Sequence, residues 1–198
     1  MKGIILAAGR GSRLNALTEE KPKPLVMLAG KTLFEWQLAA MQKSGIKDIT
    51  VMTGYQGDAF SGFHVDCIHN PNWSSSNMVR TLMCADALLS DSTCIVSYGD
   101  IVYHPDIVSR VLDCKGDIVI SYDKYWLDLW SLRFDDPLED AESFLEREGF
   151  LVDIGRRTSL LSEISGQYMG LLKISPAGWA QIKHILEFEG QHFCDKLD

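Results

Sequence analysis

Strand-like and helix-like segments alternate through roughly the first 120 residues of this 198-residue chain. Such alternation is typical of a parallel sheet with helices on both faces. The sequence therefore predicts a doubly wound, mostly parallel α/β fold, which binds ligands beyond the carboxyl ends of its strands. The predicted strands are residues 2–7, 49–52, 63–68, 94–98 and 117–121. The predicted helices between them are residues 33–41, 78–89 and 106–112.

Capping residues mark the first of these helices. Thr32 and Glu35 have the spacing of a capping box, so the helix is predicted to begin directly after Thr32. Gly45 is typical of a residue that follows the end of a helix. We therefore expect a well-defined helix between these two points.

The last third of the chain departs from the alternation. Residues 144–157 predict a hairpin that turns at Glu148 and Gly149, and residues 167–174 predict a further strand. Ser175, followed by Pro176, is predicted to cap a final helix. The apolar stripe of that helix is predicted to consist of Trp179, Ile182, Ile185 and Leu186.

Length and composition fit one globular domain over residues 1–198, with 46% hydrophobic and 23% charged residues. No apolar run approaches the roughly 20 residues that span a bilayer. The net charge of −8 disfavours nonspecific binding to nucleic acid or an anionic membrane. Residues 1–25 are locally basic, which suits a small anionic ligand. We expect a cytoplasmic protein with no nucleic-acid partner and no membrane insertion.

The cysteines are widely spaced and form no CxxC pair. This pattern argues against a disulfide framework and against structural zinc. Reduced, mostly buried thiols are expected instead. The five cysteines are Cys67, Cys84, Cys94, Cys114 and Cys194.

The most informative stretch follows the first predicted strand. Residues 6–14 read LAAGRGSRL and residues 21–25 read KPKPL. A glycine-rich turn lets backbone N–H groups approach phosphate oxygens, and arginine and lysine add positive charge. The sequence lacks a third glycine at Leu14 and has no GxxxxGK[ST] motif, so neither a dinucleotide-binding fingerprint nor a P-loop is favoured. Alone, the loop is also compatible with a tight turn that carries two surface arginines.

Together, these two stretches resemble the signature of the sugar-phosphate nucleotidylyltransferase family, an LAAGxGxR loop followed by PKxL. The resemblance continues at residues 98–100 (YGD) and 166–172 (GQYMGLL) and covers nearly the whole chain. Residues 75–82 (SSNMVRTL) are most similar to the branch of cytidylyltransferases that act on phosphocholine and 2-aminoethylphosphonate. The resemblance implies a Rossmann-like nucleotidyltransferase fold and Mg²⁺-dependent transfer of CMP from CTP to a small phosphorylated or phosphonylated amine.

The resemblance also implies roles for individual residues. Arg13 would hold the leaving pyrophosphate, and Lys23 would bridge the α-phosphate and the acceptor. Asp100 would bind Mg²⁺, which prefers carboxylate and phosphate oxygens. Nucleotide contacts are expected at Leu6, Ala7, Ala8, Gly9, Gly11, Ser12 and Gly99, and base-reading groups near Ser76 and Asn77.

Each role has a plainer alternative. Lys23 also fits an exposed lysine in a loop stiffened by prolines. Asp100 also fits a helix cap or a turn residue. Ser76 and Asn77 also fit the start of the following helix, and this interpretation is compatible with base reading.

The expected reaction explains why no Ser-His-Asp set is needed. A phosphate or phosphonate oxygen attacks the α-phosphorus of the nucleotide, and pyrophosphate leaves. Because this oxygen is largely anionic near pH 7, it needs no general base. Catalysis then depends on positioning the two anions and countering their charge.

Aromatic and acidic side chains gather in a segment after the predicted central strands. Aromatic faces attract ammonium groups, so Trp126 and Trp130 are candidate acceptor-binding residues. Their spacing fits the core stripe of a short helix equally well. The resemblance adds Tyr168 in the GQYMG segment, and Arg156 with its neighbour Arg157, as further acceptor contacts.

One departure from the family concerns the end of the chain. Related proteins run several elements further and supply a second acidic metal ligand, whereas this sequence stops at Asp198. A truncated chain, or the front of a longer or fused protein, is therefore expected. Two alternative functions remain open: a UTP- or dTTP-dependent sugar 1-phosphate nucleotidylyltransferase and a noncatalytic nucleotide-binding domain.

Overall fold

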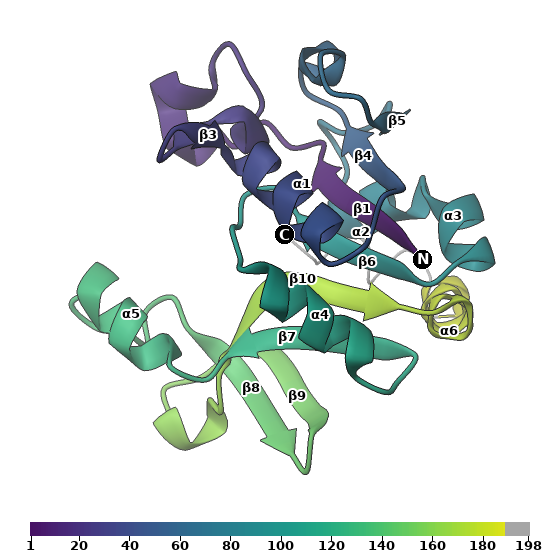
Figure 1. Cartoon of the computed structure of the whole chain (residues 1–198). Helices are drawn as coiled ribbons and strands as arrows, with labels where there is room; N and C mark the ends of the chain where they lie inside the picture. The colour runs from purple at the N-terminus through teal and green to yellow at the C-terminus, as the bar shows by residue number, and fades with distance from the viewer. Residues whose placement is uncertain (189–198) are drawn as a thin grey trace. The chain divides into compact units, whose positions relative to one another are not determined.

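The computed structural model of the protein describes residues 1–188, apart from the side chains of Arg13 and Asn15 (Figure 1). The chain divides into two compact units. The first unit comprises Met1–Val119 and the chain from Gly170 onward, and the second unit is Ile120–Met169. The single nucleotidyltransferase domain expected over residues 1–198 stays a prediction, because two compact units can belong to one domain.

A sheet with the strand order β5-β4-β1-β6-β10-β7 forms the centre of the fold, and parts of β7 and β10 belong to the second unit. β1 pairs in parallel with β4 on one side and with β6 on the other, and β5 pairs in parallel with β4. β10 runs antiparallel to β6. The strands are β1 (Lys2–Ala7), β4 (Ile49–Thr53), β5 (Asp66–His69), β6 (Cys94–Tyr98), β7 (Ile118–Asp123) and β10 (Gln167–Ile174).

Helices cover both faces of this sheet (Figure 1). Ile5 of β1 packs in a core cluster with Phe34 and Val108, which belong to α1 and α4. Its neighbour Ile4 packs in a second cluster with Trp179 of α6, because successive strand residues point to opposite faces. The predicted doubly wound, mostly parallel α/β fold is therefore confirmed. The helices are α1 (Leu33–Lys43), α2 (Met78–Met83), α3 (Asp86–Asp91), α4 (Pro105–Asp113) and α6 (Pro176–Phe188).

Short elements fill the connections of the first unit. Four of the five lie between β1 and α1, and one follows β4. The five elements are the 3₁₀ helices η1 (Ser12–Thr18), η2 (Lys23–Leu25) and η3 (Gly57–Phe60) and the short strands β2 (Met27–Leu28) and β3 (Lys31–Thr32).

Several boundaries agree with the sequence predictions. β1 and β10 have the predicted bounds. The capping box forms, with Glu35 N donating to Thr32 Oγ1 at 3.1 Å and Thr32 N donating to Glu35 Oε2 at 2.7 Å. At the start of α6, Gly178 N donates to Ser175 Oγ at 3.1 Å, so the predicted cap is confirmed.

The helix predicted over residues 78–89 is instead two helices, α2 and α3. Asp86 begins α3, and its Oδ1 accepts hydrogen bonds from Trp179 Nε1 at 2.7 Å and Lys183 Nζ at 2.8 Å. Helical spacing cannot show such a tertiary contact. The predicted stripe of α6 is also wrong in part, since Ile185 is exposed.

The strand predicted over residues 63–68 is shorter than expected and begins at Asp66. Phe63 lies outside the strand because its ring packs edge-on against Phe34, with the ring centroids 4.9 Å apart. An alternating pattern does not distinguish a strand residue from an aromatic side chain that enters the core from a loop.

The prediction of mostly buried thiols is wrong for the described cysteines. Three of them are exposed, and only Cys94 is buried. Burial raises the pKa of the Cys94 thiol to about 11. Cys194 lies outside the described residues. The exposed cysteines are Cys67 on the edge strand β5, Cys84 and Cys114.

The second unit contains a hairpin and a short helix. The predicted turn is confirmed: Glu148 and Gly149 have φ angles of 53° and 83°, a left-handed conformation that glycine adopts easily. Trp126, Ala141 and Ile164 form a small core against which Trp130 packs. The elements are α5 (Trp126–Arg133), β8 (Glu142–Arg147), β9 (Phe150–Arg157) and η4 (Leu161–Glu163).

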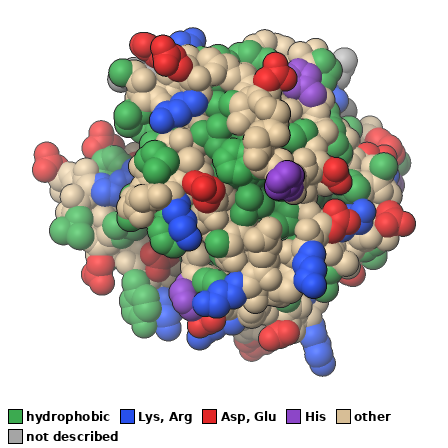
Figure 2. Space-filling model, turned by 45° about the horizontal axis from the view of Figure 1, so that its top comes forward, with side chains coloured by type: hydrophobic (Ala, Val, Ile, Leu, Met, Phe, Trp, Pro, Cys, Tyr) green, Lys and Arg blue, Asp and Glu red, His purple; other side chains and the backbone are tan. Residues whose placement is uncertain are grey.

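Charged side chains of both signs are interspersed on the face shown in Figure 2. Lys and Arg side chains alternate there with Asp and Glu side chains, so this face presents no large field of one sign. Within residues 1–188, no helix is both long and apolar enough to span a bilayer.

Candidate functional site

The loop after β1 lies at the carboxyl end of the central sheet and exposes its backbone. Ala7 and Ala8 are buried, whereas Gly9 is exposed. Ala8 O accepts a hydrogen bond from Tyr55 N at 2.9 Å, which ties the loop to the end of β4. A Cβ atom on Gly9 would meet nothing within 4 Å, so packing within the protein does not explain this glycine. Bare backbone at a strand end leaves room for a ligand to approach closely.

Gly11 allows the lysine-containing stretch to lie against this loop. Its φ of 69° is left-handed, and a Cβ atom here would lie only 2.8 Å from Lys23 Cβ. Thr18 Oγ1 donates to Gly11 O at 3.0 Å and closes the turn. The stem of Lys23 therefore rests on the backbone at Gly11, which directs the lysine along the loop.

Lys23 and Asp100 meet although 77 residues separate them. Lys23 Nζ lies 2.6 Å from Asp100 Oδ2, and the two side chains are 31% and 37% exposed. The structure thus brings together the residue predicted to act on the phosphates and the residue predicted to bind metal. Both remain accessible to a ligand from solvent.

Gly99 makes this meeting possible. Gly99 N donates to Leu6 O at 2.9 Å, which joins the ends of β6 and β1. A Cβ atom on Gly99 would lie 2.5 Å from Leu6 O and 2.7 Å from Pro24 Cγ. Only glycine allows both approaches, so it holds Asp100 beside the proline that follows Lys23.

The donor set fits a magnesium ion that arrives with phosphates. Among the described side chains, no group of three or more His, Cys, Asp or Glu could hold a metal ion. Mg²⁺ usually binds through one or two carboxylates together with substrate phosphates and water. A single half-exposed carboxylate at Asp100 suits that mode and does not suit a resident metal held by protein alone.

Asn70 organises the segment predicted to read the base, and the sequence analysis missed it. Its Nδ2 donates to Ser76 Oγ and to Thr81 Oγ1, both at 2.9 Å, and its Oδ1 accepts from Asn72 N at 2.9 Å. This side chain is almost completely buried. A polar residue followed by proline directly after an edge strand is the signal that could have found it.

Both interpretations of Ser76 and Asn77 retain support. Asn77 caps α2, because its Oδ1 accepts from Arg80 N at 3.1 Å. Ser76 Oγ accepts from Asn70, which orients the hydroxyl and leaves its hydrogen for another acceptor. The segment therefore starts a helix, and its base-reading role stays a prediction.

Aromatic side chains flank the same end of the sheet. Tyr55 packs edge-on against Trp73 with ring centroids 5.5 Å apart, and the Arg10 guanidinium lies 5.7 Å from the Tyr55 ring centroid. Tyr55 OH donates to Glu19 O at 2.5 Å. Sequence reasoning did not single out these aromatic residues. Ser12 begins η1 and is exposed, whereas the predicted Arg13 side chain lies outside the described part of the structure.

The candidate acceptor residues belong to the second unit. Trp126 is 3% exposed and forms part of the core of that unit, so its ring offers no open face. Trp130 is only partly buried, and its Nε1 donates to Asp140 O at 3.3 Å. Tyr168 is half-buried in β10. The core interpretation therefore describes Trp126 well, whereas Trp130 and Tyr168 keep accessible surface.

The two neighbouring arginines have different surroundings. Arg156 Nε and Nη2 donate to the carboxylate of Asp153 at 3.1 and 2.9 Å, and Nη2 lies 3.8 Å from Glu163 Oε2. These hydrogen bonds raise the pKa of Arg156 and lower that of Asp153. In contrast, Arg157 forms no ion pair within the described residues.

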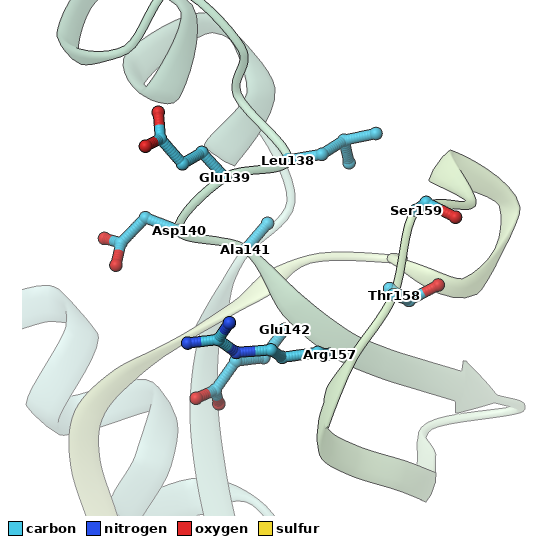
Figure 3. A pocket seen from close by; sticks show the side chains of 8 residues that line it. All are labelled: Leu138, Glu139, Asp140, Ala141, Glu142, Arg157, Thr158 and Ser159. Atoms are coloured by element: carbon cyan, nitrogen blue, oxygen red, sulfur yellow. The ribbon is translucent and has the colours of Figure 1, made fainter.

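Arg157 lines a surface cavity of about 400 Å³ in the second unit. Figure 3 shows its guanidinium extending to the same side as the carboxylates of Glu139, Asp140 and Glu142. The residues that line the cavity therefore include one cation and three carboxylates. The other lining residues are Leu138, Ala141, Thr158 and Ser159.

Comparisons with known proteins agree with these features. Residues 3–151 match the family described as the MobA-like NTP transferase domain. The chain is 38% identical to a CTP:phosphoglutamine cytidylyltransferase of Campylobacter jejuni over 185 residues, which cover 88% of this chain and 73% of that protein. It is 35% identical to a choline-phosphate cytidylyltransferase of Streptococcus pneumoniae over 96 residues, which cover 46% of this chain and 42% of the relative.

A solved structure shares the fold at low sequence identity. The CTP:phosphocholine cytidylyltransferase from Streptococcus pneumoniae aligns with a TM-score of 0.71 and 21% identity, over 98% of this chain and 80% of that chain. The family match extends over most of the sequence, and the Campylobacter relative aligns along most of both proteins. The chain therefore belongs to the MobA-like NTP transferase family.

Proposed function

We propose that this protein is a cytidylyltransferase, which transfers CMP from CTP to a small acceptor that carries both a phosphoryl group and an amino or ammonium group. The observation that carries this proposal is the contact between Lys23 and Asp100 beside the exposed backbone after β1. The similarity to a CTP:phosphoglutamine cytidylyltransferase supports CTP as the donor and makes phosphoglutamine the first acceptor to test.

In the proposed reaction, an anionic oxygen of the acceptor forms a bond to the α-phosphorus of CTP. The bond between the α-phosphorus and the bridging oxygen breaks, and pyrophosphate leaves with that electron pair. Lys23 counters the charge of the α-phosphate and the incoming oxygen, and Arg13 holds the leaving pyrophosphate. Because the attacking oxygen is already ionised near pH 7, no side chain needs to remove a proton.

Asp100 is the residue that would hold Mg²⁺ together with the phosphates. When bound, the ion would neutralise phosphate charge and fix the geometry of the triphosphate. The exposed backbone at Gly9 would accept the nucleotide, and Gly11 would keep Lys23 against it. These residues all belong to the first unit.

The proposed acceptor is inferred from side chains of the second unit. Phosphoglutamine carries a carboxylate, which phosphocholine lacks, and Arg157, which has no ion-pair partner among residues 1–188, lines a cavity together with three acidic side chains. Such a mixed surface suits an amino-acid end, with its carboxylate on Arg157 and its ammonium group on the acidic side chains. The Trp130 ring, which would favour the quaternary ammonium of phosphocholine, already has the Arg133 guanidinium 5.2 Å from its centroid.

Release of pyrophosphate tests the proposal directly. CTP should be offered with phosphoglutamine, phosphocholine and 2-aminoethylphosphonate, and UTP and dTTP with glucose 1-phosphate. CTP with an amine-bearing acceptor should react fastest. Faster reaction of a hexose 1-phosphate with UTP or dTTP would identify a sugar nucleotidylyltransferase, and nucleotide binding without turnover of any pair would indicate a noncatalytic domain.

The two arginines provide a matched test of the acceptor site. Arg157→Ala should raise the KM for phosphoglutamine and leave the affinity for CTP unchanged. Arg156→Ala is the comparison variant: the resemblance also places Arg156 at the acceptor, but its guanidinium is already bound by Asp153, so its loss should matter less. An equal effect of both substitutions, or none at Arg157, would remove Arg157 from the acceptor site.

A further inference from the structure

Gln37 is a buried polar side chain that the proposed reaction does not use. It lies in α1, on the side of the helix that enters the core, and is 0% exposed. The capping box at Thr32 fixes the start of this helix five residues before Gln37. The helix therefore places the Gln37 amide next to Tyr98, the last residue of β6.

The Gln37 amide holds the backbone on both sides of Asp100. Its Nε2 donates to Tyr98 O at 3.0 Å and to Ile101 O at 2.5 Å. An amide NH₂ group has two hydrogens, so each carbonyl can receive one of them. The segment between these carbonyls is Gly99 and Asp100, and Gly99 N is itself tied to Leu6 O at 2.9 Å.

This arrangement carries a cost for folding. Gln37 Oε1 has no hydrogen-bond partner among the described residues although it is buried. A buried acceptor without a partner is unfavourable; leucine would avoid that cost but would remove the amide donor from the carbonyls of Tyr98 and Ile101. Turning the amide over would place Oε1 against two carbonyl oxygens, so the orientation with Nε2 toward them is the favourable one. The side chain therefore acts as a donor to the loop that carries Asp100, at the cost of one unpaired acceptor.

We infer that Gln37 is a positioning residue, which sets the Asp100 carboxylate where it can meet Lys23 and a phosphate-bound Mg²⁺. This inference rests on the proposed role of Asp100 in binding MgCTP. With both flanking carbonyls held from the core, the loop has little freedom, and the Asp100 carboxylate stays 2.6 Å from Lys23 Nζ. Without the amide, the same carboxylate would sample a wider range of positions.

Binding of CTP at increasing Mg²⁺ concentrations tests this role without relying on turnover. Calorimetry should compare the wild type with Gln37→Leu and Gln37→Met, and Gln42→Leu is the control because Gln42 is exposed on the same helix. Both Gln37 variants should need about tenfold or more Mg²⁺ to reach the same CTP affinity, as expected when a group that orients a metal ligand is lost. Affinity for CTP without metal should change by less than about twofold.

A double-mutant cycle shows whether Gln37 acts through Asp100. Asp100→Asn should remove most of the Mg²⁺ dependence, and adding Gln37→Met to it should have little further effect. If Asp100→Asn alone has an effect and the folded Gln37 variants match the wild type, the inference about Gln37 fails and the proposed function stands. If CTP binding by the wild type does not depend on Mg²⁺, both fail.

A second measurement needs no substitution at Gln37. In nuclear magnetic resonance spectra of the wild type, the Gln37 side-chain NH₂ hydrogens should exchange slowly and should shift when MgCTP binds. The same resonances should not shift when MgCTP is added to Asp100→Asn. Fast exchange of these hydrogens, or resonances that do not shift when MgCTP binds to the wild type, would overturn the inference.

Discussion

At the scale of single residues, the site depends on a contact between opposite charges that contributes little to folding. The Lys23–Asp100 pair is about one-third exposed on each side, and pairs of this kind contribute at most about 1 kcal/mol to stability. The lysine can therefore be removed with little loss of stability. Any large effect of such a substitution must then come from what the lysine does with a ligand.

Lys23→Ala should lower turnover by about 10²- to 10³-fold, because one preorganised group that counters transition-state charge has an effect of this size. CTP affinity and the melting temperature should change little. Steady-state kinetics and calorimetry measure these quantities, with Lys21→Ala in the same loop as the control. Near-normal turnover of Lys23→Ala would show that the lysine does not act on the phosphates.

Gly11→Ala tests how the loop directs Lys23. The added methyl group would strain the left-handed backbone, at a cost of about 1–2 kcal/mol, and would also press on Lys23 Cβ. Gly30→Ala is a matched control, since Gly30 also has a positive φ but a Cβ there would meet nothing within 4 Å. Gly11→Ala should lose at least as much stability as Gly30→Ala, and only Gly11→Ala should lose most of its turnover. Equal activities of the two variants would contradict this role of Gly11.

At the scale of elements, the sequence predicted those features that depend on residues close together in the chain. The capping box at Thr32 and the turn at Gly149 depend on a few neighbouring residues, and both form as expected. The break between α2 and α3 lies next to Asp86, which contacts Trp179 and Lys183 far along the chain, and helical spacing shows no such contact. For the same reason, the sequence indicated Lys23 and Asp100 separately, whereas only the fold revealed that Gln37 bonds to the backbone on both sides of Asp100 and that Asn70 bonds to Ser76.

Because of the contact between α3 and α6, the free energy of unfolding should depend on pH. Hydrogen bonds from Lys183 and then Trp179 lower the pKa of Asp86 to about 2, below the ordinary value near 3.9. A lowered pKa in the folded state means that the ionised carboxylate stabilises the fold above about pH 4, and that this contribution disappears as the pH falls toward about 2.

Asp86→Asn should therefore be less stable than the wild type at pH 7, and the difference should shrink between about pH 4 and pH 2. Urea unfolding at these pH values measures the effect. Asp91→Asn, at the other end of α3, is the control and should show a much smaller change. A stability difference at Asp86 that is the same at pH 2 and pH 7 would contradict the ion pair.

At the scale of the whole molecule, the proposed roles divide between the two units. The residues assigned to the nucleotide, including Gly9, Lys23, Ser76 and Asp100, all belong to the first unit. The residues proposed for the acceptor, including Arg157, belong to the second. A family that transfers nucleotides to many acceptors can keep one unit for the triphosphate and vary the other, because function depends on the site and not on the fold alone.

This division predicts a different hydrogen-exchange pattern for each ligand. MgCTP should slow amide exchange in residues 6–14, 70–77 and 98–101, where backbone groups surround the proposed nucleotide site. Phosphoglutamine should slow exchange mainly in residues 138–142 and 156–159, which include the cavity at Arg157. Hydrogen exchange read by mass spectrometry resolves these segments. If MgCTP protected only the second unit, or phosphoglutamine only the first, the roles would have to be reassigned, because a ligand restricts the backbone that it contacts.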